Sequence, residues 1–423
     1  MFSTFGRKVA ARSGILELMD DLGHALTVEP DMLMLGGGNP AAIPEMQTLW
    51  RERMSELLQE DATFDRMLGN YDPPRGNPRF LRALAGLLER ELGWAIGPEN
   101  LAVTNGSQSA FFFLFNLLAG EYANGRHRKI LLPLAPEYIG YADQGIDEGI
   151  FVSCRPNIEW PLTPAARVFK YRVDFAAVED ALENHDIAAI AVSRPTNPTG
   201  NVLTDEEMTR LSQLARLHNI PLLIDNAYGA PFPGVIFTDA KPFWDENTIL
   251  TLSLSKLGLP GTRTAVVVGP PEVAGAVAAM TAVIGLANGN IGQRLVQPYL
   301  EDGRLLEIGR TVLRPFYRER NRQAQKWVHQ FFGAKNLAYG LHVSEGAFFH
   351  WLWFRRLKVT TRELYERLKQ RRVLVVPGEY FFFGLLEEWD HRHECIRLNF
   401  SGPPEVVREG LRIIADEAEA VSE

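Results

Sequence analysis

Residues 249–256 read ILTLSLSK, an apolar run that ends with two serines and a lysine. Other short runs rich in leucine or β-branched residues lie at 130–134, 187–193, 221–225 and 264–269, and stretches of helical period separate them. This alternation is typical of a mostly parallel sheet covered by helices. The sequence therefore predicts an α/β fold around this segment.

Local sequence features predict two helices in this region. Thr204 and Glu207 have the spacing of a capping box, and apolar residues at helical intervals follow within 208–217. We expect a crossover helix there. The run AFFFLFNLLA at 110–119 is about half the length that a membrane-spanning helix requires. We expect it to form a buried helix.

Composition excludes several classes of partner. The 423 residues are 46% hydrophobic, which is enough for two domains, and the net charge of -8 forms no basic surface for nucleic acid. Cys154 and Cys395 are too few for a disulfide framework and lack the spacing of a zinc site. Residues 1–7 lack the apolar stretch of a secretory signal. We expect a cytoplasmic protein with no metal site, no membrane partner and no nucleic-acid partner.

Polar residues follow the predicted strands. The segments at the strand ends are PEY at 136–138, RPTNP at 194–198, DNAY at 225–228 and SLSK at 253–256. Ligands of open α/β sheets bind beyond the carboxyl ends of the strands. An aromatic ring, an amide, a carboxylate with a phenol, and a lysine should therefore meet at one edge.

These groups suit pyridoxal phosphate, which needs an amine for a Schiff base and an acid opposite its pyridine nitrogen. Lys256 offers the amine. Asp225 closes an apolar strand, so its buried carboxylate calls for a cation such as a protonated pyridine nitrogen. Tyr228 and Asn197 can donate to the phenolic oxygen. Taken singly, these residues have ordinary alternatives: a surface lysine, a helix cap and a turn.

The phosphate has candidate partners on two segments. Gly106, Ser107 and Gln108 open the phenylalanine-rich helix, and a helix N-terminus offers backbone N–H groups and the positive end of a dipole. Ser253 and the guanidinium of Arg263 would complete the pocket from the other side.

At these residues the chain resembles the fold-type I aminotransferases, the family that includes aspartate aminotransferase. The resemblance covers almost the whole chain and includes GGGNP at 36–40, YDPPRG at 71–76, NPTG at 197–200, SLSK at 253–256 and IRLNF at 396–400. It implies a large domain with a mostly parallel sheet, a smaller α+β domain, and transfer of amino groups between amino acids and 2-oxo acids.

The resemblance also implies roles for single residues. Lys256 becomes the Schiff-base lysine and general base, and Asp225 becomes the partner of the pyridine nitrogen. Tyr228 and Asn197 become the phenolic-oxygen donors, and Tyr138 stacks on the ring.

Further roles follow from the same resemblance. Arg397 binds the substrate carboxylate, for which its planar fork is well suited, with Gly38 and Asn197 beside the substrate. Ser255 is expected beside the cofactor. Tyr71 is expected to cross a dimer interface to the phosphate of the neighbouring subunit, which implies a homodimer.

One branch of the family is closer than the others. The loop from Lys256 to Arg263 is one residue shorter than the commoner family spacing, and LGGGNPA at 35–41, APEYIGY at 135–141 and WLWF at 351–354 accompany it. These features resemble the valine-pyruvate aminotransferases. The implied reaction turns valine and pyruvate into 3-methyl-2-oxobutanoate and alanine.

The predicted large domain spans 46–305, the small domain combines 1–45 with 306–423, and the active site lies between them. Other functions on the same fold include a carbon-sulfur lyase and a non-catalytic effector-binding module. The short segment before the glycines at 36–38 counts against the basic DNA-binding domain of such a module. Asn39-Pro40 counts against nucleotide binding at these glycines, because a helix should continue there.

Overall fold

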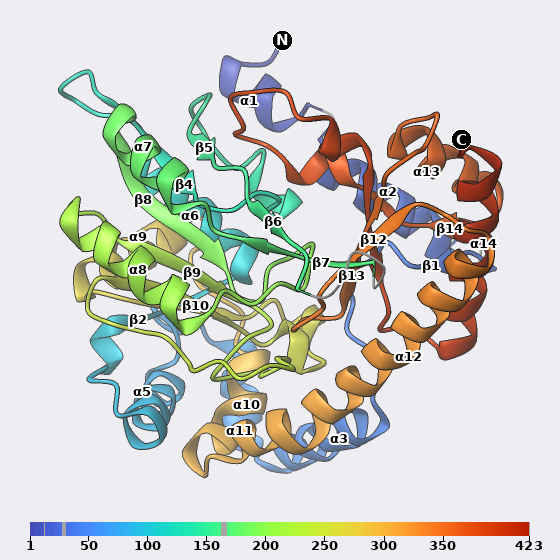
Figure 1. Ribbon diagram of the computed structural model, residues 1–423. Coiled ribbons are helices and arrows are strands. Elements are labelled where there is room, and N and C mark those ends of the chain that lie inside the picture. The colour runs from blue at the N-terminus through green and yellow to red at the C-terminus, as the bar shows by residue number, and fades with distance from the viewer. Residues whose placement is uncertain (12, 28–30, 162–166, 423) are drawn as a thin grey trace.

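A computed structural model of the chain describes residues 1–11, 13–27, 31–161 and 167–422. Figure 1 shows a larger sheet on the left and a second sheet, flanked by long helices, on the right. The larger sheet has the order β2-β11-β10-β9-β8-β4-β3, with β5 beside β4. Its strands are β2 (Leu101–Thr104), β3 (Gly120–Glu121), β4 (His127–Leu132), β5 (Phe151–Ser153), β8 (Ile187–Ser193), β9 (Leu222–Asn226), β10 (Thr248–Ser253) and β11 (Ala265–Val268).

The predicted mostly parallel sheet is confirmed. Strands β5, β4, β8, β9 and β10 run parallel to one another, while β11 is antiparallel to both β10 and β2, and β3 is antiparallel to β4. The run at 187–193 forms β8 without a shift. The run at 130–134 forms a strand that ends at Leu132, because Pro133 has no N–H to donate to the sheet.

Helices cover both faces of this sheet. α6 (Ser107–Leu118) and α9 (Pro271–Gly285) pack on one face, where Leu223 joins the phenylalanines of α6 in one apolar cluster. α8 (Asp205–Leu217) contacts β8 and β9, and Leu222 and Ile224 belong to the other cluster. Alternate residues of a strand point to opposite faces, which accounts for this division. α7 (Phe175–Asn184) precedes β8. The predicted capping box at Thr204 and Glu207 is confirmed.

The second sheet has the order β15-β16-β13-β12-β7-β6. Its strands are β6 (Asn157–Glu159), β7 (Val168–Arg172), β12 (Tyr339–His342), β13 (Phe349–Phe354), β15 (Val376–Pro377) and β16 (Cys395–Asn399). The helices beside it are α12 (Arg314–Ala334), α13 (Thr361–Gln370) and α14 (Pro404–Ala420), and β1 (Leu33–Met34) pairs with β14 (Val373–Leu374).

The division into domains at 46–305 and the remainder stays a prediction, with one departure in the strand pairing. β6 and β7 fall within the predicted large domain, but β7 pairs with β12 of the second sheet. The pairing satisfies backbone N–H and C=O groups that an edge strand would leave open. Four further helices pack around α10 (Ile291–Glu301): α3 (Pro44–Gln59), α4 (Asp61–Gly69), α5 (Pro78–Leu92) and α11 (Arg304–Ile308). The lower part of Figure 1 shows α3, α5, α10 and α11.

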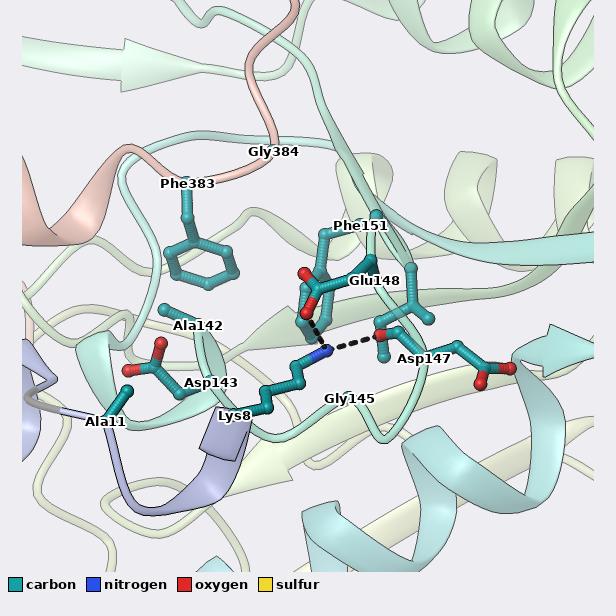
Figure 2. Close-up of a pocket in the computed structure, with 12 residues that line it drawn as sticks. Lys8, Ala11, Ala142, Asp143, Gly145, Asp147, Glu148, Phe151, Phe383 and Gly384 are labelled. Atoms are coloured by element: carbon teal, nitrogen blue, oxygen red, sulfur yellow. Dashed lines mark hydrogen bonds and ion pairs between the residues drawn. The ribbon is translucent and has the colours of Figure 1, made fainter. Parts of the chain in front are cut away.

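The N-terminal helix α1 (Thr4–Val9) is attached to the loop before β5. In Figure 2 the Lys8 side chain reaches the Glu148 carboxylate, at 3.1 Å, and the Asp147 carbonyl, at 2.8 Å. This contact ties the start of the chain to the larger sheet.

The next helix, α2 (Gly14–Thr27), contacts α13 and the turn that follows β15. The Glu17 carboxylate accepts hydrogen bonds from Arg362, at 2.5 Å, and from Tyr380, at 2.9 Å. Asp21 pairs with Lys369 at 2.9 Å. α2 is therefore held by charged contacts along one side. Across the described ranges, no helix is long and apolar enough to cross a membrane.

Candidate active site

A cavity of about 340 Å³ lies at the carboxyl ends of the parallel strands. Segments far apart in the chain line it, including α2, the loop after β1, the start of α6, the ends of β8, β9 and β10, and β16. All predicted site residues except Gly106 and Tyr71 line this cavity: Gly38, Ser107, Gln108, Tyr138, Asn197, Asp225, Tyr228, Ser253, Ser255, Lys256, Arg263 and Arg397.

Lys256 lies in the turn that follows β10. Its Nζ donates to the carbonyl of Gly38 at 2.7 Å and lies 5.1 Å from the centre of the Tyr228 ring. Burial, together with the positive charge of Arg397, lowers the pKa of the Lys256 amine to about 8, although the charge of Asp225 opposes both effects. A lysine with such a pKa is partly unprotonated near neutral pH and can act as a nucleophile or a base.

Asp225 is the next-to-last residue of β9 and is 8% exposed. Its carboxylate accepts hydrogen bonds from the Tyr141 hydroxyl and, at 2.9 Å, from the Ala227 backbone N–H. Burial raises its pKa, and these donors oppose the change. In the described part of the chain it forms no ion pair. A buried carboxylate without a counter-ion suits a cationic ligand atom.

Tyr141 was not among the predicted site residues. It is 2% exposed and lies at the end of a 3-10 turn, three residues after Tyr138, and the two rings are 5.2 Å apart. Burial raises the pKa of its hydroxyl well above the ordinary value, so it stays a donor to Asp225. The second tyrosine of APEYIGY is the signal that could have indicated it.

Arg397 lies on β16 and is 2% exposed. Its guanidinium donates to the Asn197 side-chain oxygen at 2.8 Å and to the Gly36 carbonyl at 2.6 Å, and its Nε is buried without a partner. Burial lowers the pKa of Arg397 to about 10. An arginine that faces a cavity with neutral partners and a free Nε suits a ligand carboxylate.

The start of α6 forms the end of the cavity predicted to hold phosphate. Gly106 has a φ of +81°, and a Cβ at this position would lie 2.1 Å from an Arg263 nitrogen, so only glycine lets that guanidinium approach. The Ser107 hydroxyl oxygen is buried without a partner, while Gln108 donates to the Gly140 carbonyl at 2.8 Å. Ser253 accepts from the Ser255 N–H at 3.2 Å. A helix N-terminus, an unpaired hydroxyl and a guanidinium together suit a phosphate.

The cavity thus combines a lysine of lowered pKa, a buried carboxylate without an ion pair, a tyrosine ring, and a helix start with a guanidinium beside it. These are the groups that pyridoxal phosphate requires, so the residues present fit that cofactor. Over the same described residues, no group of three or more His, Cys, Asp or Glu side chains could hold a metal ion.

Comparisons with known proteins agree with the predicted resemblance. The family model for aminotransferase class I and II matches residues 32–414. The chain is 48% identical to the valine-pyruvate aminotransferase of Escherichia coli (strain K12), over 99% of this chain and 98% of that protein.

Two solved structures extend the likeness to the fold. The valine-pyruvate aminotransferase of Salmonella typhimurium LT2 matches with a TM-score of 0.84 and 46% identity, over 96% of this chain and 98% of that one. A protein of Psychrobacter arcticum 273-4 assigned as an amino-acid aminotransferase matches with a TM-score of 0.96 and 43% identity, over 100% and 99% of the two chains. The predicted fold class is confirmed, and the chain belongs to the class I and II aminotransferases.

Proposed function

We propose that this aminotransferase uses pyridoxal phosphate to move an amino group between a small aliphatic L-amino acid and a 2-oxo acid, with valine and pyruvate as the main pair. The observation that carries the proposal is the meeting of Lys256, Asp225 and Arg397 in one cavity. The 48% identity to a valine-pyruvate aminotransferase supports the choice of substrates.

Each predicted residue has a task in holding the cofactor. Lys256 would bind its aldehyde carbon, Asp225 its protonated pyridine nitrogen, and Tyr138 one face of the ring. Tyr228 and Asn197 would donate to the phenolic oxygen. The phosphate would lie against four polar residues and the glycine that admits one of them: Gly106, Ser107, Gln108, Ser253 and Arg263. Ser255 lines the same cavity.

Bound pyridoxal phosphate supplies an electron sink for the substrate α-carbon. The chain supplies the orientation and the proton transfer. Arg397 binds the α-carboxylate and so turns the α-carbon toward Lys256. Lys256 in its unprotonated form would take the α-proton and pass it to the cofactor carbon to which Lys256 had been bound, and its lowered pKa keeps that form available. Asp225 keeps a proton on the ring nitrogen throughout.

The apolar residues that line the cavity favour a substrate with an aliphatic side chain. Ile15, Leu18 and Met19 of α2 line it. Of the described residues that line it, the cations are Lys256, Arg263 and Arg397, and each already has a role. A second carboxylate, as in aspartate, would meet no further cation there and would lose its hydration without compensation.

We also propose a homodimer. Tyr71 is 81% exposed and does not line this chain's own cavity. Asn290 donates to the backbone carbonyls of Met67 and Asn70, so the end of α4 lies beside the segment that leads from α9 into α10. Exposed apolar side chains gather on these two segments: Leu68 at 60%, Val283 at 86%, Ile284 at 60% and Leu286 at 57%. Such a patch is typical of an interface.

Hybrid dimers test the assignment of Tyr71. Subunits with Lys256→Ala and subunits with Tyr71→Ala, unfolded together and refolded, should form mixed dimers with one site free of both changes. Recovery of activity above that of either parent is expected. No recovery, or a monomer in sedimentation, would contradict the dimer.

The two cysteines are free and buried, which supports our proposal of a cytoplasmic location.

A substrate screen tests the main proposal. Purified enzyme is given pyruvate with each amino acid in turn, and alanine and the new oxo acid are measured. We expect valine to have one of the highest kcat/KM values and aspartate one of the lowest. A carbon-sulfur lyase, the alternative, would release pyruvate from a cysteine conjugate without any oxo acid. A kcat/KM for aspartate at or above that for valine would refute the proposed pair.

A further inference from the structure

A second buried carboxylate lies beside the candidate site and has no role in the proposed chemistry. Glu137 immediately precedes Tyr138 and is 4% exposed. Its side chain accepts hydrogen bonds from the Tyr138 N–H at 2.8 Å, from the Ser193 N–H at 3.0 Å, and from the Ser193 hydroxyl. All of these partners donate, and such donors favour the ionised form of a carboxyl group.

Ser193 connects Glu137 to the strand end that lies beside Asp225. Ser193 ends β8, and its neighbour across the sheet on β9 is Asp225. The Glu137 carboxylate therefore connects the backbone of Tyr138, which would stack on the cofactor ring, to the strand end beside Asp225, which would bind the edge of that ring. The Glu137 backbone N–H is fixed as well, by the Phe381 carbonyl at 2.9 Å.

We propose that Glu137 is a positioning residue of this active site. Its carboxylate holds the stacking ring of Tyr138 in register with Asp225, and its negative charge, at the pH values where it is ionised, favours the protonated form of the bound cofactor. This inference rests on the proposed use of pyridoxal phosphate.

The charges around Glu137 support the second part. In the described part of the chain, Glu137 forms no ion pair, and the charge of Asp225 acts on it. Burial and the charge of Asp225, opposed by the three donors, raise the pKa of Glu137 to about 8, so the negative charge of Glu137 develops as the pH passes through that value. The pKa of the Tyr141 hydroxyl rises with both carboxylates nearby. Two ionised carboxylates near the cofactor would favour its protonated form more strongly than one.

The test uses the pH dependence of the absorption spectrum of the cofactor-loaded protein without substrate. Glu137→Gln keeps the size of the side chain and removes its charge. We expect the pKa of the spectral change to fall by about one unit and the Kd for the cofactor to rise about tenfold. Glu137→Asp, which keeps the charge, should leave the spectral pKa near that of the wild type.

Two further variants complete the experiment. Glu207→Gln is the matched control, because Glu207 lies on α8 in a capping box and accepts from Thr204 at 2.8 Å. It should change neither quantity. Ser193→Ala removes one donor to Glu137 and should shift the spectral pKa in the same direction as Glu137→Gln, by less.

Thermal unfolding of the cofactor-free proteins shows which variants fold. A spectral titration of folded Glu137→Gln that coincides with that of the wild type would overturn the inference. If Glu137→Gln does not fold, an unchanged titration in Ser193→Ala would overturn it instead. If the wild type itself binds no pyridoxal phosphate, the proposed function fails, and the inference fails with it.

Discussion

Replacement of Arg397 by lysine tests how the candidate site recognises its substrate. Arg397 is 2% exposed and donates to the Asn197 oxygen at 2.8 Å and the Gly36 carbonyl at 2.6 Å. Lysine keeps the positive charge but lacks the planar fork that binds a carboxylate through two parallel hydrogen bonds. One charge-assisted hydrogen bond contributes about 1.5 to 3 kcal/mol. The kcat/KM for every amino acid should therefore fall by roughly 10- to 150-fold.

Isobutylamine makes the test specific, because it is valine without the α-carboxylate. Arg397→Lys should reduce the kcat/KM for valine but leave the slow reaction of isobutylamine nearly unchanged. Arg53→Lys is the control, since Arg53 is a 7% exposed arginine of α3 that pairs with Glu56 at 2.9 Å. It should affect both substrates alike. If Arg397→Lys keeps the wild-type preference for valine over isobutylamine, Arg397 does not bind the carboxylate.

Further predictions concern the lysine, the ring acid and the cavity wall. Borohydride should attach the cofactor irreversibly to Lys256, and peptide mapping that finds the label on another lysine would contradict the assignment; Lys256→Ala should lose transamination by about 10²- to 10⁴-fold. Because the pKa of Lys256 is lowered to about 8, the rate at which cofactor-free protein binds pyridoxal phosphate should rise with pH and level off above about 8, as the reactive unprotonated amine accumulates; a rate that falls over this range would refute this. Asp225→Ala should still bind cofactor but show a reduced kcat, and Asp225→Glu should reduce kcat less. A near-native kcat in Asp225→Ala would mean that Asp225 has a structural role only. Leu18→Ala removes part of the apolar wall and should raise the kcat/KM ratio of leucine to valine by about 10-fold or more, whereas an unchanged ratio would place the substrate side chain elsewhere.

The parts of the fold that could be predicted depend on neighbours in the chain. The strand at 187–193 and the capping box at Thr204 were predicted because apolar runs and cap residues act over a few positions. The departures arise from partners that the sequence does not identify. β7 lies in the middle of the chain but pairs with β12, near residue 341. The residues at 168–172 do not by themselves predict which strand they pair with.

For the candidate site, too, some properties follow from the sequence and others from the tertiary structure. The sequence by itself determined which chemical groups are available, because the amine of Lys256, the carboxylate of Asp225 and the guanidinium of Arg397 are properties of single residues in recognisable motifs. Only the tertiary structure decided what those groups can do. It places Arg397 against Asn197, 200 residues earlier, Tyr141 against Asp225, and Glu137 against Ser193. A pKa and a hydrogen-bond partner depend on burial and on distance through space, and these are set only when remote segments pack together.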